Sequence, residues 1–144
     1  MTSIRRDIVA IIDDDPDVRK ATATLLSAFG YVTYTFKSAE AFLSVAATSK
    51  AKCLVVDVQL GDISGVELAR QLGDAGFRFP IIFMTALDDE VISRQAEHLG
   101  CVAYLRKPFG ADLLIEAIVR AISNPSEPNR AGLRDLEAPC RRGD

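Results

Sequence analysis

The feature that most constrains this fold is a short apolar run that stops abruptly at three acidic residues. Residues 8–12 read Ile-Val-Ala-Ile-Ile, and Asp13, Asp14 and Asp15 follow directly. An apolar run without polar alternation is typical of a strand that is buried on both faces, as in a parallel sheet. Four further strands are predicted along the chain, at residues 31–36, 53–56, 80–84 and 102–105.

Helical patterns occupy the segments between these strands. The first predicted helix opens with Asp15 as its N-cap and Pro16 in its first turn, and Gly30 stands where a C-terminal cap belongs. The other helices are predicted to begin near residues 38, 64, 88 and 111. This strict alternation predicts an α/β fold with a mostly parallel sheet, covered by helices on both faces and connected right-handedly.

Length and composition fit one globular domain followed by a short tail. The chain has 144 residues, which is room for about one domain, with 49% apolar and 26% charged residues. Three of its six prolines lie after residue 123, where charges of both signs alternate. We therefore expect a domain over residues 6–123 and a flexible tail or linker over residues 124–144.

Charge and hydropathy argue against several classes of protein. A net charge of −3 gives the whole chain no attraction to nucleic acid or to an anionic membrane. No apolar run approaches the ~20 residues of a membrane span, and the N-terminus lacks a secretory signal. Three cysteines without metal-ligand spacing suit a reducing compartment. We expect a cytoplasmic protein that binds neither nucleic acid nor membrane directly.

Polar side chains follow the predicted strands at the points where the strands end. Asp13 and Asp14 follow the first strand, Asp57 the third, Thr85 the fourth and Lys107 the fifth. In open α/β sheets, ligands bind outside the carboxyl ends of the strands. We therefore expect these five side chains to converge on one crevice at that edge of the sheet.

These groups suit one kind of chemistry. Two carboxylates about 4 Å apart repel by about 4 kcal/mol at an effective dielectric near 20, so three of them require a cation. Carboxylate oxygens with few other protein ligands suit Mg²⁺. The ammonium group of Lys107 and the hydroxyl of Thr85 can contact phosphoryl oxygens while Asp57 attacks in line. The residues therefore predict aspartyl-phosphate chemistry.

The order of these residues resembles the receiver domains of response regulators in two-component signal transduction, of the chemotaxis-regulator type. Asp13-Asp14 is similar to the family's acidic pair, Asp57 to its phosphoacceptor, Thr85-Ala86 to its hydroxyl and small residue, and Lys107-Pro108-Phe109 to its Lys-Pro-Phe element. The resemblance covers about residues 6–123. It implies a flavodoxin-like (βα)5 doubly wound parallel sheet with strand order 2-1-3-4-5.

The resemblance also implies roles for individual groups. Mg²⁺ would be bound by three groups directly and by a fourth through water, namely Asp14, Asp57, the backbone carbonyl of Gln59 and, through water, Asp13. The phosphoryl group would be contacted by Thr85, Ala86 and Lys107. The peptide bond between Lys107 and Pro108 would be cis, an isomer that is accessible because the second residue is proline.

The same resemblance implies a phosphorylation-dependent switch. A histidine kinase or a phosphotransfer protein would supply the phosphoryl group, and the protein would catalyse only its own phosphorylation and dephosphorylation. Thr85 would move to the phosphoryl group, and Tyr104 would rotate into the vacated space; alternatively, Tyr104 is a half-buried strand residue with its hydroxyl at the edge. Signalling to a downstream protein, or formation of a homodimer, would use residues 88–122.

The loop after Asp57 departs from the family pattern. Where the family often has Asp-x-x-Met-Pro-x-x-x-Gly, residues 57–65 place Gly61 at the proline position, which removes a restriction on φ. Asp62 adds a negative charge near the site, with an effect that the sequence leaves open. His98, the only histidine, is expected at the surface near a helix end, so the protein should receive phosphoryl groups rather than originate them.

Two other functions stay open beside phosphorylation-dependent signalling. One is a receiver-like interaction module that is not phosphorylated, although Asp57, Thr85 and Lys107 are all present. The other is a small phosphatase with an aspartyl nucleophile, because Asp13-x-Asp15 matches enzymes of the haloacid-dehalogenase type. Residues 124–144 are too few for a helix-turn-helix output domain, so we expect either a stand-alone receiver or a fragment of a longer regulator.

Overall fold

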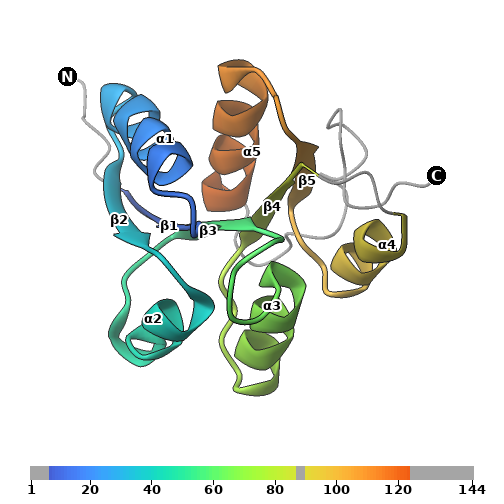
Figure 1. The fold of residues 1–144 in the computed structure, drawn as a ribbon. Helices are drawn as coiled ribbons and strands as arrows, with labels where there is room; N and C mark the ends of the chain where they lie inside the picture. The colour runs from blue at the N-terminus through green and yellow to red at the C-terminus, as the bar shows by residue number, and fades with distance from the viewer. Residues whose placement is uncertain (1–6, 87–89, 124–144) are drawn as a thin grey trace.

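The structure is a computed structural model, which describes residues 7–86 and 90–123. Five parallel strands form one sheet in the order β2-β1-β3-β4-β5, as the flavodoxin-like resemblance implied (Figure 1). The strands are β1 (Ile8–Ile12), β2 (Val32–Phe36), β3 (Cys53–Asp57), β4 (Ile81–Thr85) and β5 (Ala103–Arg106). β3, β4 and β5 each end one residue later than predicted, because Asp57 pairs with Met84 and Thr85 pairs with Arg106 across the ladder.

The helices cover both faces of the sheet, as the alternating pattern predicted. They are α1 (Pro16–Ala28), α2 (Ala39–Leu43), α3 (Gly65–Asp74), α4 (Glu90–His98) and α5 (Ala111–Ser123), with a short 3₁₀ helix at Ala46–Thr48. Figure 1 shows α1 and α5 on one face of the sheet and α2 and α3 on the other. Two apolar cores result, one on each face, because the strands between them carry apolar side chains in both directions.

The beginnings of the helices follow the cap residues in the sequence. Asp15 accepts hydrogen bonds from the backbone N–H groups of Asp17 and Val18, which confirms its expected role as the N-cap of α1. Ser64 caps α3 in the same way. Gly30 has a φ of 95° just beyond the end of α1, a conformation that a residue with a β-carbon rarely adopts.

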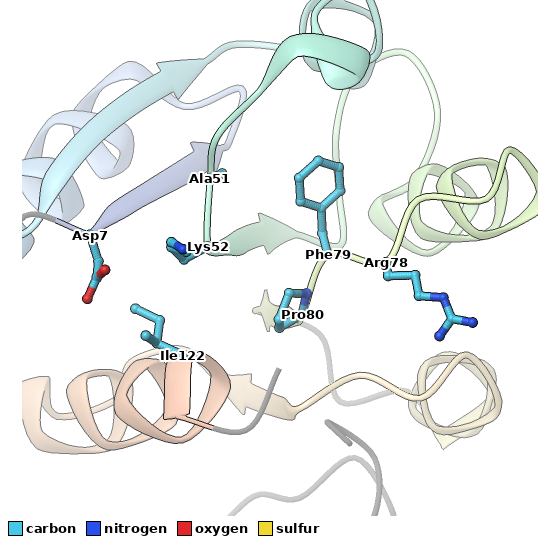
Figure 2. A pocket seen from close by; sticks show the side chains of 7 residues that line it. All are labelled: Asp7, Ala51, Lys52, Arg78, Phe79, Pro80 and Ile122. Carbon is cyan, nitrogen blue, oxygen red and sulfur yellow. The ribbon is translucent and has the colours of Figure 1, made fainter. Parts of the chain in front are cut away.

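The amino ends of the strands line an open pocket of about 300 Å³. Lys52 precedes β3, Pro80 precedes β4 and Ile122 comes from the end of α5 (Figure 2). This pocket is at the edge of the sheet opposite to the one at which Asp13, Asp57 and Thr85 lie. It is therefore separate from the predicted site.

The described residues bear on two expectations about the cellular setting, namely the lack of a membrane span and the state of the cysteines. None of the described helices has the length and apolar character that are needed to cross a membrane. Cys53 is a free thiol, and its burial in β3 raises the pKa of that thiol.

Candidate functional site

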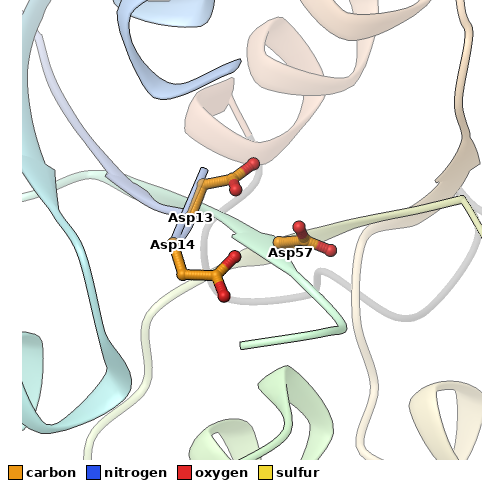
Figure 3. A group of neighbouring side chains, drawn as sticks. All are labelled: Asp13, Asp14 and Asp57. Atoms are coloured by element: carbon orange, nitrogen blue, oxygen red, sulfur yellow. The ribbon is translucent and has the colours of Figure 1, made fainter. Parts of the chain in front are cut away.

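Three carboxylates meet at the carboxyl ends of two neighbouring strands. Asp13 and Asp14 follow β1, Asp57 is the last residue of β3, and the two strands pair with Ile12 opposite Val56. Oxygens of the three carboxylates lie within 4.8 Å of one another (Figure 3). The side chains of Asp13 and Asp57 are buried, whereas that of Asp14 is exposed. The predicted acidic cluster is therefore present in the fold.

Lys107 lies between two of these carboxylates. Its ammonium nitrogen is 3.4 Å from Oδ2 of Asp57, to which it donates a hydrogen bond, and 3.5 Å from Oδ2 of Asp13. The backbone N–H of Lys107 donates to the carbonyl oxygen of Thr85 at 2.7 Å, which fixes the residue at the end of the sheet. The peptide bond from Lys107 to Pro108 is cis, the isomer that the resemblance implied.

Thr85 and Ala86 lie at the same edge of the sheet. Thr85 ends β4, and its neighbour Met84 is paired with Asp57 in the ladder. The backbone N–H of Val58 donates to the carbonyl of Met84 at 2.9 Å, which continues this pairing into the loop. Thr85 is fully buried, whereas Ala86 is exposed. All five predicted strand-end side chains thus belong to one edge of the sheet.

The electrostatics of the site centre on Asp13. Burial raises the pKa of this carboxyl, and the negative charge of Asp57 raises it further. A hydrogen bond from the backbone N–H of Asp15, at 3.0 Å to Oδ1, and the charge of Lys107 act in the opposite direction and do not cancel the rise. The site therefore carries more negative charge than its own groups neutralise.

The donor set fits a hard divalent cation. Oδ2 of Asp13 is buried and accepts no hydrogen bond from any described residue; its contact with Lys107 is an ion pair at 3.5 Å. A buried carboxylate oxygen without a hydrogen bond is costly unless a cation or water meets it. Three carboxylates that supply only oxygen ligands match the preference of Mg²⁺ and Ca²⁺ over that of soft metals. This acidic cluster can therefore bind a metal ion.

The comparisons with known proteins agree with this arrangement. A family model described as "Response regulator receiver domain" matches residues 9–119. The chain belongs to the response regulator receiver family. Receiver domains are the phosphorylation-dependent signalling modules of two-component systems, and they interact with histidine kinases or phosphotransfer proteins.

Two relatives of the chain are described as transcriptional regulatory proteins. The chain is 41% identical over 113 residues to the transcriptional regulatory protein FixJ of Rhizobium meliloti (strain 1021), which covers 78% of this chain and 55% of that protein. It is 33% identical over 115 residues to the transcriptional regulatory protein TdiR of Thauera aromatica, covering 80% and 51%. The crystal structure of FixJ-N superposes with a TM-score of 0.78 at 39% identity, covering 83% of this chain and 95% of that one. The chain spans about half the length of these curated relatives.

Tyr104 is more deeply buried in this receiver domain than the alternative of a half-buried strand residue predicted. Its side chain is 6% exposed and packs in the core on the face covered by α2 and α3, opposite Phe83 in the β4–β5 ladder. Its role in a switch stays a prediction. His98, in contrast, is exposed in the last turn of α4, as expected.

Two contacts near the site were not predicted from the sequence. The Nη1 of Arg19, in α1, donates a hydrogen bond to the backbone carbonyl of Asp13 at 2.8 Å. Asp62, whose effect the sequence left open, directs its carboxylate to the beginning of α2, where it accepts backbone hydrogen bonds from Ala39 and Glu40. Both contacts depend on how the elements pack against each other, so no local pattern in the sequence predicts them.

The start of α3 is packed directly against the end of β3. The backbone N–H of Gly65 donates to the carbonyl of Val58 at 2.8 Å. A β-carbon at position 65 would overlap the backbone oxygen of Asp57 and lie 2.9 Å from Cγ1 of Val56. Glycine is therefore required here by the close approach of the helix to the strand that carries Asp57.

Proposed function

We propose that this receiver domain accepts a phosphoryl group on Asp57 from the phosphohistidine of a histidine kinase or phosphotransfer protein. The observation that most supports this proposal is the placement of Lys107, whose ammonium group is 3.4 Å from Asp57 and 3.5 Å from Asp13. A cation in this position can pair with an aspartate at rest and with a phosphoryl oxygen after transfer.

The transfer needs one nucleophile and several groups that stabilise charge. An oxygen of Asp57 attacks phosphorus, and the new O–P bond forms as the P–N bond breaks and its electron pair stays on the leaving imidazole. Lys107 neutralises charge on the phosphoryl oxygens, and the hydroxyl of Thr85 and the backbone at Ala86 contact the same group. The protein catalyses only its own phosphorylation and, by attack of water on the acyl phosphate, its own dephosphorylation.

Mg²⁺ is the metal that we assign to the acidic cluster. Its ligands in this proposal are Asp14, Asp57, the backbone carbonyl of Gln59 and, through water, Asp13. The buried Oδ2 of Asp13 and the crowding of three carboxylates support this assignment. When bound, the ion neutralises charge on the oxygens of the acceptor and of the phosphoryl group.

We assign the transmission of the signal from the phosphorylated site to Thr85 and Tyr104. In this proposal Thr85 moves to the phosphoryl group, Tyr104 rotates toward the space it leaves, and the surface of residues 88–122 changes with them. Val91 in α4 and Val119 in α5 are exposed apolar side chains on these elements, 63% and 49% accessible. They support a contact with a downstream protein or with a second copy of the chain. The cytoplasmic location expected from the sequence stays a prediction.

The phosphatase alternative is weakened by Asp15. An enzyme of that type needs the second acid of Asp13-x-Asp15 for catalysis, but the carboxylate of Asp15 accepts hydrogen bonds from Asp17 and Val18 at the start of α1. Asp15 is thus engaged as a helix cap. This contact favours the signalling function over the phosphatase.

Labelling with a small phosphodonor tests the proposal. Acetyl phosphate with Mg²⁺ should add one acid-stable, base-labile phosphoryl group, which peptide mapping should locate on Asp57. The variant Asp57→Ala should take up none. A label on another residue, or no label on the wild-type protein, would overturn the proposal, and the second result would favour the interaction module that is not phosphorylated.

A further inference from the structure

The carboxylate of Asp62, in the loop after β3, caps the first turn of α2. The side chain of Asp62 accepts hydrogen bonds from the backbone N–H of Glu40 at 3.1 Å and of Ala39 at 3.4 Å. The N–H of Ala41 is bound instead by the hydroxyl of Ser38, the helix's own N-cap, at 3.0 Å. The backbone donors in the first turn of α2 are therefore divided between a local cap and a side chain from a distant loop.

The charge of Asp62 suits this position. The N-terminus of a helix carries a partial positive charge and binds carboxylates through charge-assisted hydrogen bonds. Burial is the largest single influence and raises the pKa of the Asp62 carboxyl, but the hydrogen bonds from the backbone N–H of Glu40, and then from those of Ile63, Asp62 itself and Ala39, together outweigh it and lower the pKa. Asp62 is therefore ionised at neutral pH.

α2 is a fixed support for this contact. Its central side chain, Phe42, is fully buried and makes edge-to-face contacts with the rings of Phe36 at 5.2 Å and Phe79 at 5.5 Å. Phe36 belongs to β2, and Phe79 lies just before β4. Since the helix is anchored both to β2 and to the segment before β4, its contact with Asp62 restrains the loop rather than the helix.

The loop that Asp62 restrains also borders the acidic cluster. The backbone N–H of Gln59 donates to Oδ1 of Asp57 at 3.0 Å. Gly61 lies beside Asp14, since a β-carbon at position 61 would be in ordinary van der Waals contact with its Oδ2, at 3.5 Å. Glycine has more backbone freedom than any other residue, so Gly61 does not fix the path of the loop by itself. The neighbouring residue, Asp62, supplies a restraint.

We propose that Asp62 is a positioning residue, whose contact with α2 keeps Gln59 beside Asp57 and Gly61 beside Asp14. This inference rests on the proposed function, because it concerns the cation that supports phosphorylation of Asp57. Without the contact, the loop becomes ordered only when the cation binds. The conformational entropy lost in that step lowers the affinity for the cation. The reaction at saturating cation is unaffected, because Asp62 does not touch the reacting atoms.

The test is a Mg²⁺ titration of the variant Asp62→Ala. The amide NMR signals of Gln59 and Gly61 report binding, and the rate of labelling by acetyl phosphate reports the reaction. We expect the Mg²⁺ concentration at half-saturation to rise about tenfold, as is usual for groups that orient metal ligands, with an unchanged labelling rate at saturation. The variant Asp62→Asn should recover part of the affinity, because its amide oxygen can still accept a hydrogen bond.

The matched control is Ser38→Ala, which removes the other cap of α2 and leaves the loop untouched. Thermal unfolding followed by circular dichroism verifies that each variant is folded. An unchanged Mg²⁺ affinity in Asp62→Ala, or an equal loss in Ser38→Ala, would overturn this inference alone. If the wild-type protein bound no Mg²⁺ or were not labelled on Asp57, the proposed function would fail instead.

Discussion

Asp13, Asp14 and Asp57 present carboxylate oxygens within 4.8 Å of one another, and Lys107 pairs with only two of them. Burial and the charge of Asp57 raise the pKa of Asp13, so this carboxyl binds a proton more tightly in the folded chain than in the unfolded one. Its contribution to stability is complete below its ordinary pKa of 3.8 and is lost as the pH rises through the raised value. Near neutral pH, the metal-free fold therefore holds a charged carboxylate that is disfavoured first by its burial and then by repulsion from Asp57.

Replacing Asp14 by asparagine should relieve part of the repulsion among the three carboxylates. In the absence of Mg²⁺ we expect Asp14→Asn to raise the free energy of unfolding at pH 7 by about 1 kcal/mol or less, since Asp14 is exposed and its charge is screened. The gain should shrink as the pH falls and Asp13 becomes protonated. The same variant should bind Mg²⁺ about tenfold more weakly or worse. Urea unfolding and NMR titration measure the two effects.

The control for this variant is Asp17→Asn, which removes an exposed acid from the first turn of α1, outside the cluster. It should leave the Mg²⁺ affinity unchanged. If Asp14→Asn lowered both stability and Mg²⁺ affinity, the three carboxylates would not be crowded in the way described above.

At the scale of elements, the junction between β3 and α3 leaves no room for a side chain on the first residue of the helix. Gly65→Ala should therefore destabilise the fold by roughly 1–3 kcal/mol, the usual effect of overpacking, because the new β-carbon meets the backbone of Asp57 rather than a movable side chain. Labelling of Asp57 by acetyl phosphate should slow as the strand end is displaced. Chemical denaturation and a labelling time course provide the measurements.

A second glycine in the same helix gives a matched control. Gly73 lies near the end of α3, and a β-carbon there would have no atom within 4 Å. Gly73→Ala should stabilise the protein by about 0.5–1 kcal/mol, since alanine is the better helix former, and should leave labelling unchanged. Equal effects at positions 65 and 73 would argue against a steric origin.

The elements themselves were largely predictable from the sequence. Apolar runs and cap residues located every strand and every α-helix, because burial and capping are local patterns, whereas the short 3₁₀ helix at Ala46–Thr48 was not predicted. The ends of β3, β4 and β5 were each placed one residue short, since pairing at a strand end depends on two strands at once. The contact of Asp62 with Glu40 joins residues 22 apart in the chain, and it could not be seen before the loop and α2 were packed together.

At the scale of the whole molecule, the proposed switch links Thr85, at the end of β4, to Tyr104 in β5. Beryllofluoride mimics the acyl phosphate, so with Mg²⁺ it should shift NMR signals across residues 84–109 as Thr85 and Tyr104 move. The variant Thr85→Ala should keep the shifts around Asp57 and lose those around Tyr104. Shifts confined to the neighbourhood of Asp57 in the wild-type protein would argue against this switch.

The composition of the site was also accessible from the sequence, but its electrostatics were not. The order of residues at the strand ends predicted which side chains meet at the edge of the sheet. The depth of Asp13, the two contacts of Lys107 and the burial of Tyr104 follow from packing around the sheet, which periodicity does not specify. The contact of Arg19 with the backbone of Asp13 is of the same kind.

The missing side chain at Gly65 has a consequence for protein engineering. Since α3 starts in backbone contact with Asp57, the segment from residue 57 to residue 65 behaves as one unit whose two ends cannot be moved independently. A chimera that exchanges this segment between related proteins should keep its activity when all nine positions are transplanted together. A crossover inside the segment would join the helix start of one protein to the strand end of another, at a junction that has no room for a β-carbon.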